Sequence, residues 1–147
     1  MAKNTLEPRF IAIEGCIGAG KTSLVDLLGK QLDAQVVREK DDENPFIGKF
    51  YQDRESFGFQ TQVFFLLNRY NQYMSLAQRD LFSSVVLVDY LFNRDRLFAA
   101  LNLKDQELKL YDQIYSLLQN KVPKPDLVIF LQASTDILRS RVEKRGR

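Results

Sequence analysis

Hydrophobic and polar positions in this chain alternate between two patterns from one end to the other. Short runs that are apolar at nearly every position are typical of strands buried on both faces, whereas apolar residues spaced three and four apart are typical of helices. Strands are predicted at residues 9–14, 35–38, 84–89 and 126–132. Helices are predicted at residues 21–32, after Asn44-Pro45, and at residues 59–81, 93–101, 105–119 and from Ser134 into the basic end. Strands that alternate with helices predict an α/β fold, in which helices flank a parallel sheet.

We expect a single domain over residues 1–147, because the pattern continues through the chain without an internal repeat or a long linker. The last predicted helix is not followed by a further strand that would complete the sheet edge. The domain is therefore expected to lack its C-terminal portion.

In the first predicted helix, one face is formed by Leu24, Leu27, Leu28 and Leu32.

The composition narrows the classes of function. Apolar residues make up 45% of the chain and charged residues 27%, and a formal net charge of +2 is too small to favour a general nucleic-acid binder. The polar start has neither a signal-peptide pattern nor a membrane span, so no membrane partner is expected. The single Cys16 cannot form an internal disulfide, which fits the reducing cytoplasm. Histidine is absent, so a carboxylate is the leading candidate for any general base.

A phosphate-binding motif lies between the first predicted strand and the first predicted helix. It has the spacing Gly-x-x-x-x-Gly-Lys-Thr, in the strand-to-helix context that the P-loop requires. Backbone N–H groups of such a loop surround phosphate oxygens, Lys21 contacts the β- and γ-phosphates, and the Thr22 hydroxyl can ligate Mg²⁺. We therefore predict a P-loop NTPase fold that binds ATP and Mg²⁺. The predicted nucleotide-binding residues are Gly15, Cys16, Ile17, Gly18, Ala19, Gly20, Lys21 and Thr22.

Several further segments follow one another in a characteristic order. They are Phe10 to Thr22, Arg38-Glu39-Lys40, Glu43-Asn44-Pro45-Phe46, Phe57-Gly58-Phe59-Gln60, Asp89, Phe98-Ala99 and Arg141-Val142-Glu143-Lys144-Arg145-Gly146-Arg147. In their joint order these segments resemble the deoxynucleoside kinase family, and the bacterial members that act on deoxyadenosine, deoxyguanosine or deoxycytidine in particular. The resemblance implies transfer of a phosphoryl group from ATP to the 5'-hydroxyl of a deoxynucleoside, and a homodimer.

The resemblance also implies roles for individual side chains near the ends of strands and on the helices. Glu39, just after the second predicted strand, would be the general base toward the 5'-hydroxyl; the alternative is a solvated charge in the run 38–43. Asp89 would help to hold Mg²⁺ and its waters. Gln60 and Asp95 would bind the nucleobase, and Tyr51 the sugar 3'-hydroxyl, although Tyr51 and Asp95 also have ordinary surface interpretations.

The basic end matches the family's lid, Arg-x-x-x-Arg-Gly-Arg. Planar guanidinium groups suit phosphate oxygens, so Arg141 and Arg145 are predicted to act on the transferred phosphoryl group and Arg147 to bind the nucleotide. A short nucleic-acid-binding patch is the competing interpretation, and the absence of interleaved aromatic residues argues against it.

The chain departs from the family pattern at three positions. Tyr90 and Leu91 stand where an Arg and a Ser normally follow the acid, and Arg94 or Arg96 could substitute for the missing Arg. The family's second base-reading Arg falls at Leu67, which leaves the offset Arg69 nearby.

Two alternatives to a deoxynucleoside kinase remain open at this point. A nucleoside monophosphate kinase of the thymidylate type shares the P-loop and an Arg-containing lid. A catalytically inactive ATP-binding regulatory module would explain the unusual residues that follow Asp89.

Overall fold

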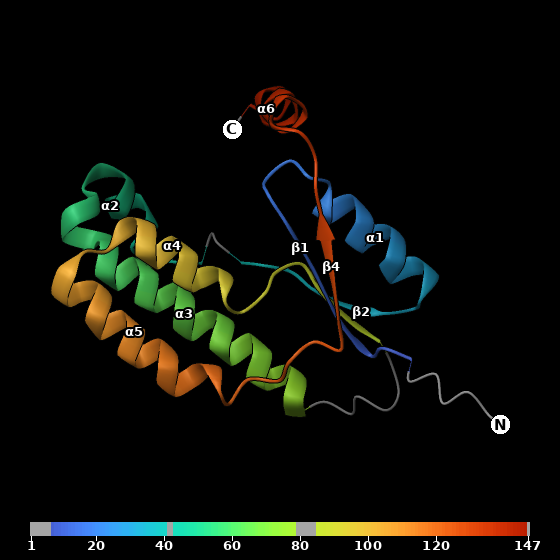
Figure 1. The fold of residues 1–147 in the computed structure, drawn as a ribbon, viewed down its shortest axis with the longest axis horizontal. Helices are drawn as coiled ribbons and strands as arrows, with labels where there is room; N and C mark the ends of the chain where they lie inside the picture. The colour runs from blue at the N-terminus through green and yellow to red at the C-terminus, as the bar shows by residue number, and fades with distance from the viewer. Residues whose placement is uncertain (1–6, 41–42, 79–84, 147) are drawn as a thin grey trace. The chain divides into compact units, whose positions relative to one another are not determined.

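The computed structural model describes residues 7–40, 43–78 and 85–146. These residues form two compact units (Figure 1). The first, here called the sheet unit, contains residues 7–38, 85–91 and 124–146; the second, the helical unit, contains residues 39–40, 43–78 and 92–123.

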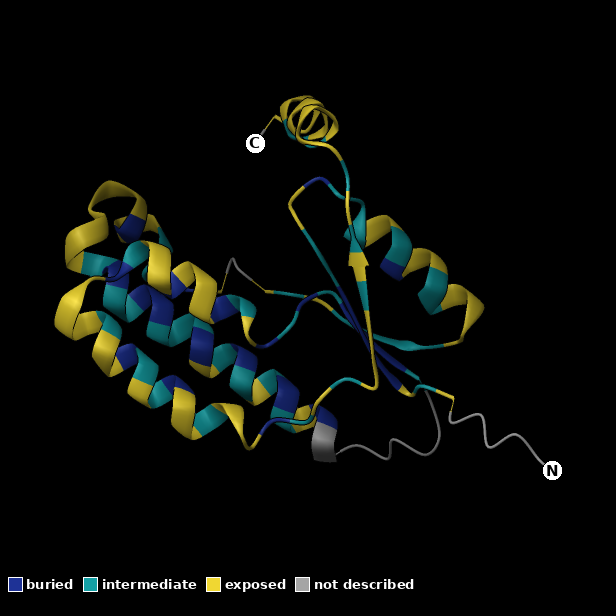
Figure 2. Ribbon diagram, in the orientation of Figure 1, coloured by how far each residue is buried: buried dark blue, intermediate teal, exposed yellow. Residues whose placement is uncertain are grey.

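The sheet unit contains four strands, β1 (Phe10–Gly15), β2 (Gln35–Val37), β3 (Val86–Val88) and β4 (Leu127–Leu131), in the order β2-β3-β1-β4. All three pairings are parallel, as the sequence pattern predicts. The two central strands, β1 and β3, are the most buried, which agrees with their continuous apolar runs. Figure 2 shows this buried centre in dark blue.

Two helices of the sheet unit follow strands directly, α1 (Lys21–Gln31) after β1 and α6 (Thr135–Lys144) after β4. The predicted cap of the last helix is confirmed, because the Ser134 hydroxyl accepts a hydrogen bond from the Ile137 N–H at 3.4 Å. The leucine face predicted for α1 is only partly buried. Val25 is the buried residue of this helix, whereas Leu27 and Leu32 are exposed.

Strand β4 is less covered than its sequence predicts. Its residues are apolar at every position, yet Leu127, Val128 and Phe130 are 42–57% exposed. The start of the strand is well anchored. Both the Arg9 and Phe10 N–H groups donate to the Asp126 carboxylate, at 3.0 and 2.9 Å, so that the strands β1 and β4 begin in register.

The helical unit contains α2 (Ile47–Gln52), α3 (Arg54–Gln78), α4 (Arg94–Asn102) and α5 (Asp105–Gln119). Helix α3 packs against each of the other three helices. Aromatic rings fill much of this core: Tyr73 packs against Phe92, and Phe92 stacks on Tyr115 at 5.6 Å between ring centroids. None of the described helices of either unit is long and apolar enough to cross a membrane.

Helix α3 begins five residues earlier than the sequence pattern predicts, at Arg54 instead of residue 59. The cause is Asp53, whose carboxylate accepts a hydrogen bond from the Ser56 N–H at 3.2 Å in the manner of an N-cap. Hydrogen bonds from Ser56 lower the pKa of the Asp53 carboxyl. Residues 79–81 of the predicted helix, and residue 84 of the predicted strand, lie outside the described residues.

Candidate functional site

The loop that joins β1 to α1 has the geometry of a phosphate cradle. Gly20, at the N-cap of α1, has φ +100°, a left-handed conformation that glycine adopts without strain, and the first N–H groups of a helix have no partner within the helix. Within the described residues, no side chain caps this turn. The backbone donors and the positive end of the helix dipole are therefore available to an anion.

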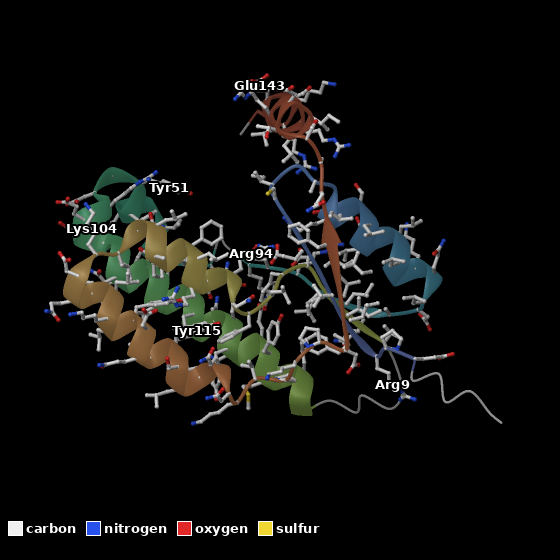
Figure 3. The ribbon with its side chains drawn as sticks, viewed as in Figure 1. Arg9, Tyr51, Arg94, Lys104, Tyr115 and Glu143 are labelled. Atoms are coloured by element: carbon white, nitrogen blue, oxygen red, sulfur yellow. The ribbon has the colours of Figure 1, made fainter. Side chains whose placement is uncertain are left out.

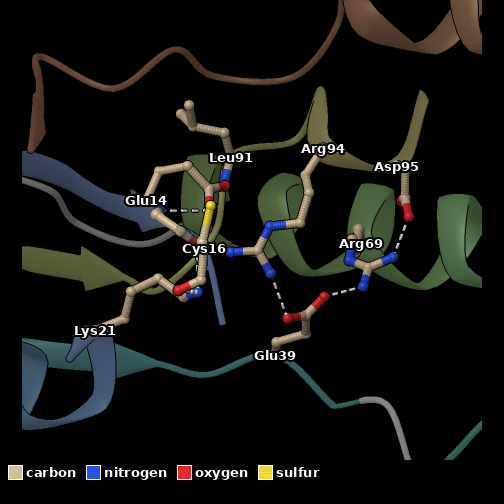
Figure 4. Close-up of polar contacts among 9 residues, drawn as sticks. Glu14, Cys16, Lys21, Glu39, Arg69, Leu91, Arg94 and Asp95 are labelled. Carbon is tan, nitrogen blue, oxygen red and sulfur yellow. Dashed lines mark hydrogen bonds and ion pairs between the residues drawn. The ribbon is translucent and has the colours of Figure 1, made fainter. Parts of the chain in front are cut away.

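Lys21 lies back along this loop. Its Nζ donates to the Gly15 carbonyl at 2.6 Å and to the Cys16 carbonyl at 3.4 Å (Figure 4). The ammonium group thus lies beside the backbone that would surround the phosphates. Thr22 follows on the first turn of α1 and is exposed, so its hydroxyl can reach a ligand.

Glu14 is a residue of this edge that the sequence reasoning missed. Its carboxylate accepts hydrogen bonds from the Gly15 N–H at 2.8 Å and from the Leu91 N–H at 3.1 Å. Glu14 thereby joins the start of the loop to the segment that follows β3. The sequence feature that could have identified Glu14 is an acidic residue at the end of the first apolar run, directly before the glycine-rich loop.

Asp89 lies one residue beyond β3, at the same edge of the sheet as the loop, because β1 and β3 are parallel. Tyr90, which stands where the family has an Arg, is completely buried and supplies no charge. The described residues include no cluster of three or more Asp, Glu, Cys or His side chains that could hold a metal ion. The hydroxyl of Thr22 and the carboxylate of Asp89 are nevertheless the hard oxygen donors that suit Mg²⁺ bound to a nucleotide.

Helix α6 packs directly on the loop at Gly18. This glycine has φ +83°, and a side chain there would place its Cβ 3.2 Å from the Leu138 carbonyl oxygen. Arg141 of the predicted lid donates from Nη1 to the Gly18 carbonyl at 3.0 Å. Arg145 is exposed at the end of α6, and Arg147 lies outside the described residues.

Glu39 belongs to a charged network within the helical unit (Figure 4). Arg69 of α3 donates through Nη2 to Glu39 Oε1 and through Nη1 to Asp95 Oδ1, so that one guanidinium bridges two carboxylates. The other oxygen of Glu39, Oε2, accepts from Arg94 Nη1 at 2.6 Å. Glu39 is therefore held from two helices, α3 and α4, and the interpretation as a freely solvated charge does not describe it.

The network is largely buried. The side chains of Arg69 and Asp95 are 7% and 1% exposed, and that of Glu39 is 18% exposed. The guanidinium of Arg69 also lies 5.0 Å from the centre of the Phe65 ring, a cation–π contact. Burial raises the pKa of the neighbouring Tyr111 hydroxyl far above its ordinary value, and the negative charge of Asp95 raises it further.

Of the two arginines that could replace the missing one, Arg94 is the one that contacts Glu39. Arg96 instead pairs with Asp112 of α5 at 3.1 Å, on the exposed side of the helical unit. Arg69 occupies the network while Leu67, at the family position, is exposed. These partners join residues that are far apart in the sequence, which is why the sequence could not choose among them.

The remaining predicted substrate residues are less constrained. Tyr51 projects from α2 (Figure 3) and is 70% exposed, with its ring beside that of Phe50. The Gln60 amide donates to the Ser56 carbonyl at 3.1 Å, one turn back along α3. Asp95, in contrast, is buried, and its Oδ1 accepts from Arg69.

A parallel sheet whose first strand ends in this glycine-rich loop, followed by a helix, defines a P-loop nucleotide-binding protein. The family model for deoxynucleoside kinases matches residues 11–147. A deoxyguanosine kinase from Bacillus subtilis is 39% identical over 94% of this chain and 67% of its own length, and a deoxyadenosine kinase from Dictyostelium discoideum is 32% identical over 99% of this chain and 60% of its own length. The chain belongs to the deoxynucleoside kinase family, and it spans about two thirds or less of the length of these relatives.

The fold is similar to that of a solved family member. The structure of deoxyadenosine kinase from M. mycoides with bound dATP matches 94% of this chain and 72% of its own chain, with a TM-score of 0.77 and 27% identity. This confirms the predicted P-loop α/β fold.

Proposed function

We propose that this protein is an ATP-dependent deoxynucleoside 5'-kinase. The observation that carries the proposal is Glu39, a carboxylate fixed by Arg69 and Arg94 in a chain that also carries the complete phosphate-binding loop. A solvated surface acid would have no need of two arginine partners. The names of the two relatives, a deoxyguanosine kinase and a deoxyadenosine kinase, favour a purine deoxynucleoside as the acceptor.

In the proposed reaction the 5'-oxygen attacks the γ-phosphorus of ATP, the bond from that phosphorus to the β,γ-bridging oxygen breaks, and Glu39 accepts the hydroxyl proton. The loop N–H groups and Lys21 hold the phosphates, and the lid residues Arg141 and Arg145 stabilise negative charge on the transferring group. Thr22 and Asp89 would hold Mg²⁺, which neutralises phosphate charge when bound.

Glu39 can act as a base while it is held. Each carboxylate oxygen has two lone-pair directions, so a carboxylate oxygen that accepts from an arginine can also accept from a substrate hydroxyl. Its exposure of 18% leaves a path for a ligand.

A panel of substrates tests the proposal. The protein is incubated with ATP and Mg²⁺ and either deoxynucleosides or deoxynucleoside monophosphates, and ADP release is followed. We expect ADP only with the deoxynucleosides. ADP only with monophosphates would instead support the thymidylate-type alternative, and no ADP with any acceptor would support the inactive ATP-binding module.

Substitution of the proposed base sharpens this test. Glu39→Gln should lower kcat by about 10² to 10⁴ while ATP binding changes little. Glu43→Gln is the matched control, because Glu43 lies in the same charged segment but pairs with Lys40 at 3.3 Å on the surface. Equal activity of Glu39→Gln and the wild type would contradict the assignment.

The proposed partners and location follow the same family. We propose a homodimer, since α4 exposes the apolar side chains of Leu97, Phe98 and Leu101 on the helical unit. Sedimentation of the protein over a range of concentrations checks the dimer. A reducing cytoplasm remains the prediction drawn from the single Cys16.

A further inference from the structure

Glu14 lies at the point where the ladder between β1 and β3 ends. Among the described residues, the last pair of this ladder is Ala12 with Val88. Beyond this pair the Glu14 carboxylate provides the acceptors: Oε1 accepts from the Gly15 N–H at 2.8 Å and Oε2 from the Leu91 N–H at 3.1 Å (Figure 4). One side chain therefore joins the backbone segments that leave two neighbouring strands.

The two segments that Glu14 joins lead to different parts of the nucleotide site. Gly15 begins the phosphate-binding loop, and its carbonyl accepts from Lys21 Nζ at 2.6 Å. Leu91 follows Asp89, the carboxylate proposed to hold Mg²⁺, by two residues. The Glu14 carboxylate therefore connects the backbone that would surround the phosphates with the segment that carries a proposed metal ligand.

We propose that Glu14 is a positioning residue, which sets the separation between the phosphate-binding loop and Asp89 so that Thr22 and Asp89 can hold the same Mg²⁺ ion. This inference rests on the ATP and Mg²⁺ site of the proposed function, and it deepens it by assigning a role to the single acid of β1. Glu14 exerts this role through two backbone N–H groups and does not ligate the metal.

A glutamate suits this position better than the residues most similar to it. Two separate N–H donors require two acceptor oxygens; a carboxylate has two, whereas the side-chain amide of a glutamine has one. An aspartate has two oxygens but is shorter by one methylene group, so it cannot reach the same two donors. A backbone N–H that loses its acceptor at a partly buried site costs free energy and releases the segment that it held.

Asp89 depends on this connection because of its own local structure. Strand β3 ends at Val88, and Asp89 and Tyr90 form a bend outside the strand ladder. Mg²⁺ requires nearly octahedral coordination by oxygens at about 2.0–2.1 Å, so a small shift of one ligand weakens its binding. Thr22 is held on the first turn of α1, at the other end of the loop. A fixed connection between the loop and the bend keeps the two ligands at one separation.

The chain contains a matched control for Glu14 at the opposite end of β1. The Asp126 carboxylate accepts from the Arg9 and Phe10 N–H groups at 3.0 and 2.9 Å, and so joins the starts of β1 and β4. The chemistry is the same as at Glu14, because one carboxylate accepts from two backbone N–H groups and joins β1 to a neighbour. Asp126 lies away from the phosphate-binding loop, so its loss should affect stability without affecting Mg²⁺.

The first measurement verifies that each substitution breaks its own contacts. Exchange of backbone amide hydrogens with deuterium is followed by NMR in the wild type, Glu14→Gln and Asp126→Asn. We expect the Leu91 amide to exchange faster in Glu14→Gln only, and the Phe10 amide in Asp126→Asn only. Thermal melting verifies that both variants fold, and it compares their losses of stability.

The second measurement is ATP binding by calorimetry, without an acceptor, in the presence and absence of Mg²⁺. Mg²⁺ should strengthen ATP binding by the wild type, because the ion would link the nucleotide to Thr22 and Asp89. In Glu14→Gln we expect this strengthening to fall by about 10-fold, while the affinity for ATP without Mg²⁺ changes less than about 3-fold. Asp126→Asn should keep the wild-type effect of Mg²⁺.

A second variant keeps the test decisive if Glu14→Gln does not fold. Glu14→Asp retains the charge and both oxygens, and only the reach of the side chain is reduced. We expect the same loss of the Mg²⁺ effect on ATP binding. In kinetic assays Glu14→Asp should need about 10-fold more Mg²⁺ for half of its maximal rate, with KM for the deoxynucleoside unchanged.

Three results would overturn the positioning role of Glu14. They are an unchanged Leu91 exchange rate in Glu14→Gln, a wild-type effect of Mg²⁺ in a folded Glu14 variant, or an equal loss of that effect in Asp126→Asn. If one of these occurs while the wild type phosphorylates deoxynucleosides, only the role of Glu14 fails. A wild type that binds ATP with Mg²⁺ but phosphorylates no acceptor refutes the kinase function instead.

Discussion

The phosphate-binding loop and the charged network use opposite physical strategies. The loop is one continuous segment of the sheet unit, and it offers backbone N–H groups and one lysine from a partly exposed edge. The network of the helical unit is made of side chains 26 to 55 residues apart, of which Arg69 and Asp95 are buried and Glu39 and Arg94 are partly buried. A backbone site depends on conformation and tolerates many side chains, whereas a buried charge network depends on every partner, since one lost partner leaves an uncompensated charge.

The largest expected effect comes from the single charge of the loop. Lys21→Ala should lower kcat/KM by about 10³ or more, because a positive charge beside the transferring phosphoryl group is lost. Kinetics at saturating deoxynucleoside measure it. Lys30→Ala, on the last turn of the same helix, is the control and should leave kcat/KM unchanged. Similar losses of kcat/KM in the two variants would mean that any positive charge on α1 has this effect, and would contradict a specific role of Lys21.

The next effect distinguishes backbone conformation from side-chain chemistry. Gly18→Ala should lower the free energy of unfolding by about 1–2 kcal/mol, because φ is +83° and the added Cβ meets the Leu138 carbonyl. The same substitution at Gly48, within α2 and with open space around it, should raise stability by about 0.5–1 kcal/mol. Urea unfolding followed by circular dichroism measures both. Changes of the same sign would contradict the conformational explanation.

The smallest effect at neutral pH is expected for Tyr111, which lies beside the charged network, and it concerns the free energy of unfolding. Burial, followed by the charge of Asp95, raises the pKa of Tyr111 above its ordinary value of 10.0, so the folded protein retains a proton that the unfolded chain loses. The contribution of Tyr111 to the free energy of unfolding is fully present below pH 10. Above pH 10 it falls by about 1.4 kcal/mol per pH unit.

Tyr111→Phe removes this proton and should flatten the loss of stability above pH 10. Near pH 8 it should change stability little, because the Tyr111 hydroxyl has no hydrogen-bond partner among the described residues. Urea unfolding at pH 8 and pH 10.5 measures the difference. Tyr51→Phe, at an exposed ring, should keep the wild-type pH slope. If stability fell with pH above 10 as steeply in Tyr111→Phe as in the wild type, the burial of this hydroxyl would not be the cause of the loss.

The fold was predictable where local pattern and tertiary environment agree. The apolar runs of β1 and β3 are central strands, and the glycine spacing at residues 15–20 identified the loop because its chemistry is contained in one segment. The early start of α3 was missed because a single side chain, Asp53, decided it. The exposure of β4 was missed because its apolar pattern carries no information on what covers it.

The sequence named candidate site residues but not the contacts that these residues make. Glu39 and Asp95 were both named from the family resemblance, yet their connection through Arg69 depends on the packing of α3 and α4. Arg94 contacts Glu39 and Arg96 contacts Asp112 because the two side chains leave the same helix turn in different directions. Neither direction is encoded in a motif.

The parallel pairing of β1 with β4 also has a consequence for biosynthesis. The loop residues are synthesised directly after β1, but the strand partners of β1 are synthesised only after α1, β2, α2 and α3. Helices α2 and α3 can form from neighbouring residues while the sheet waits for distant ones, which makes its formation a slow step of high contact order. The nucleotide-binding sequence is therefore synthesised before both strands that pair with β1.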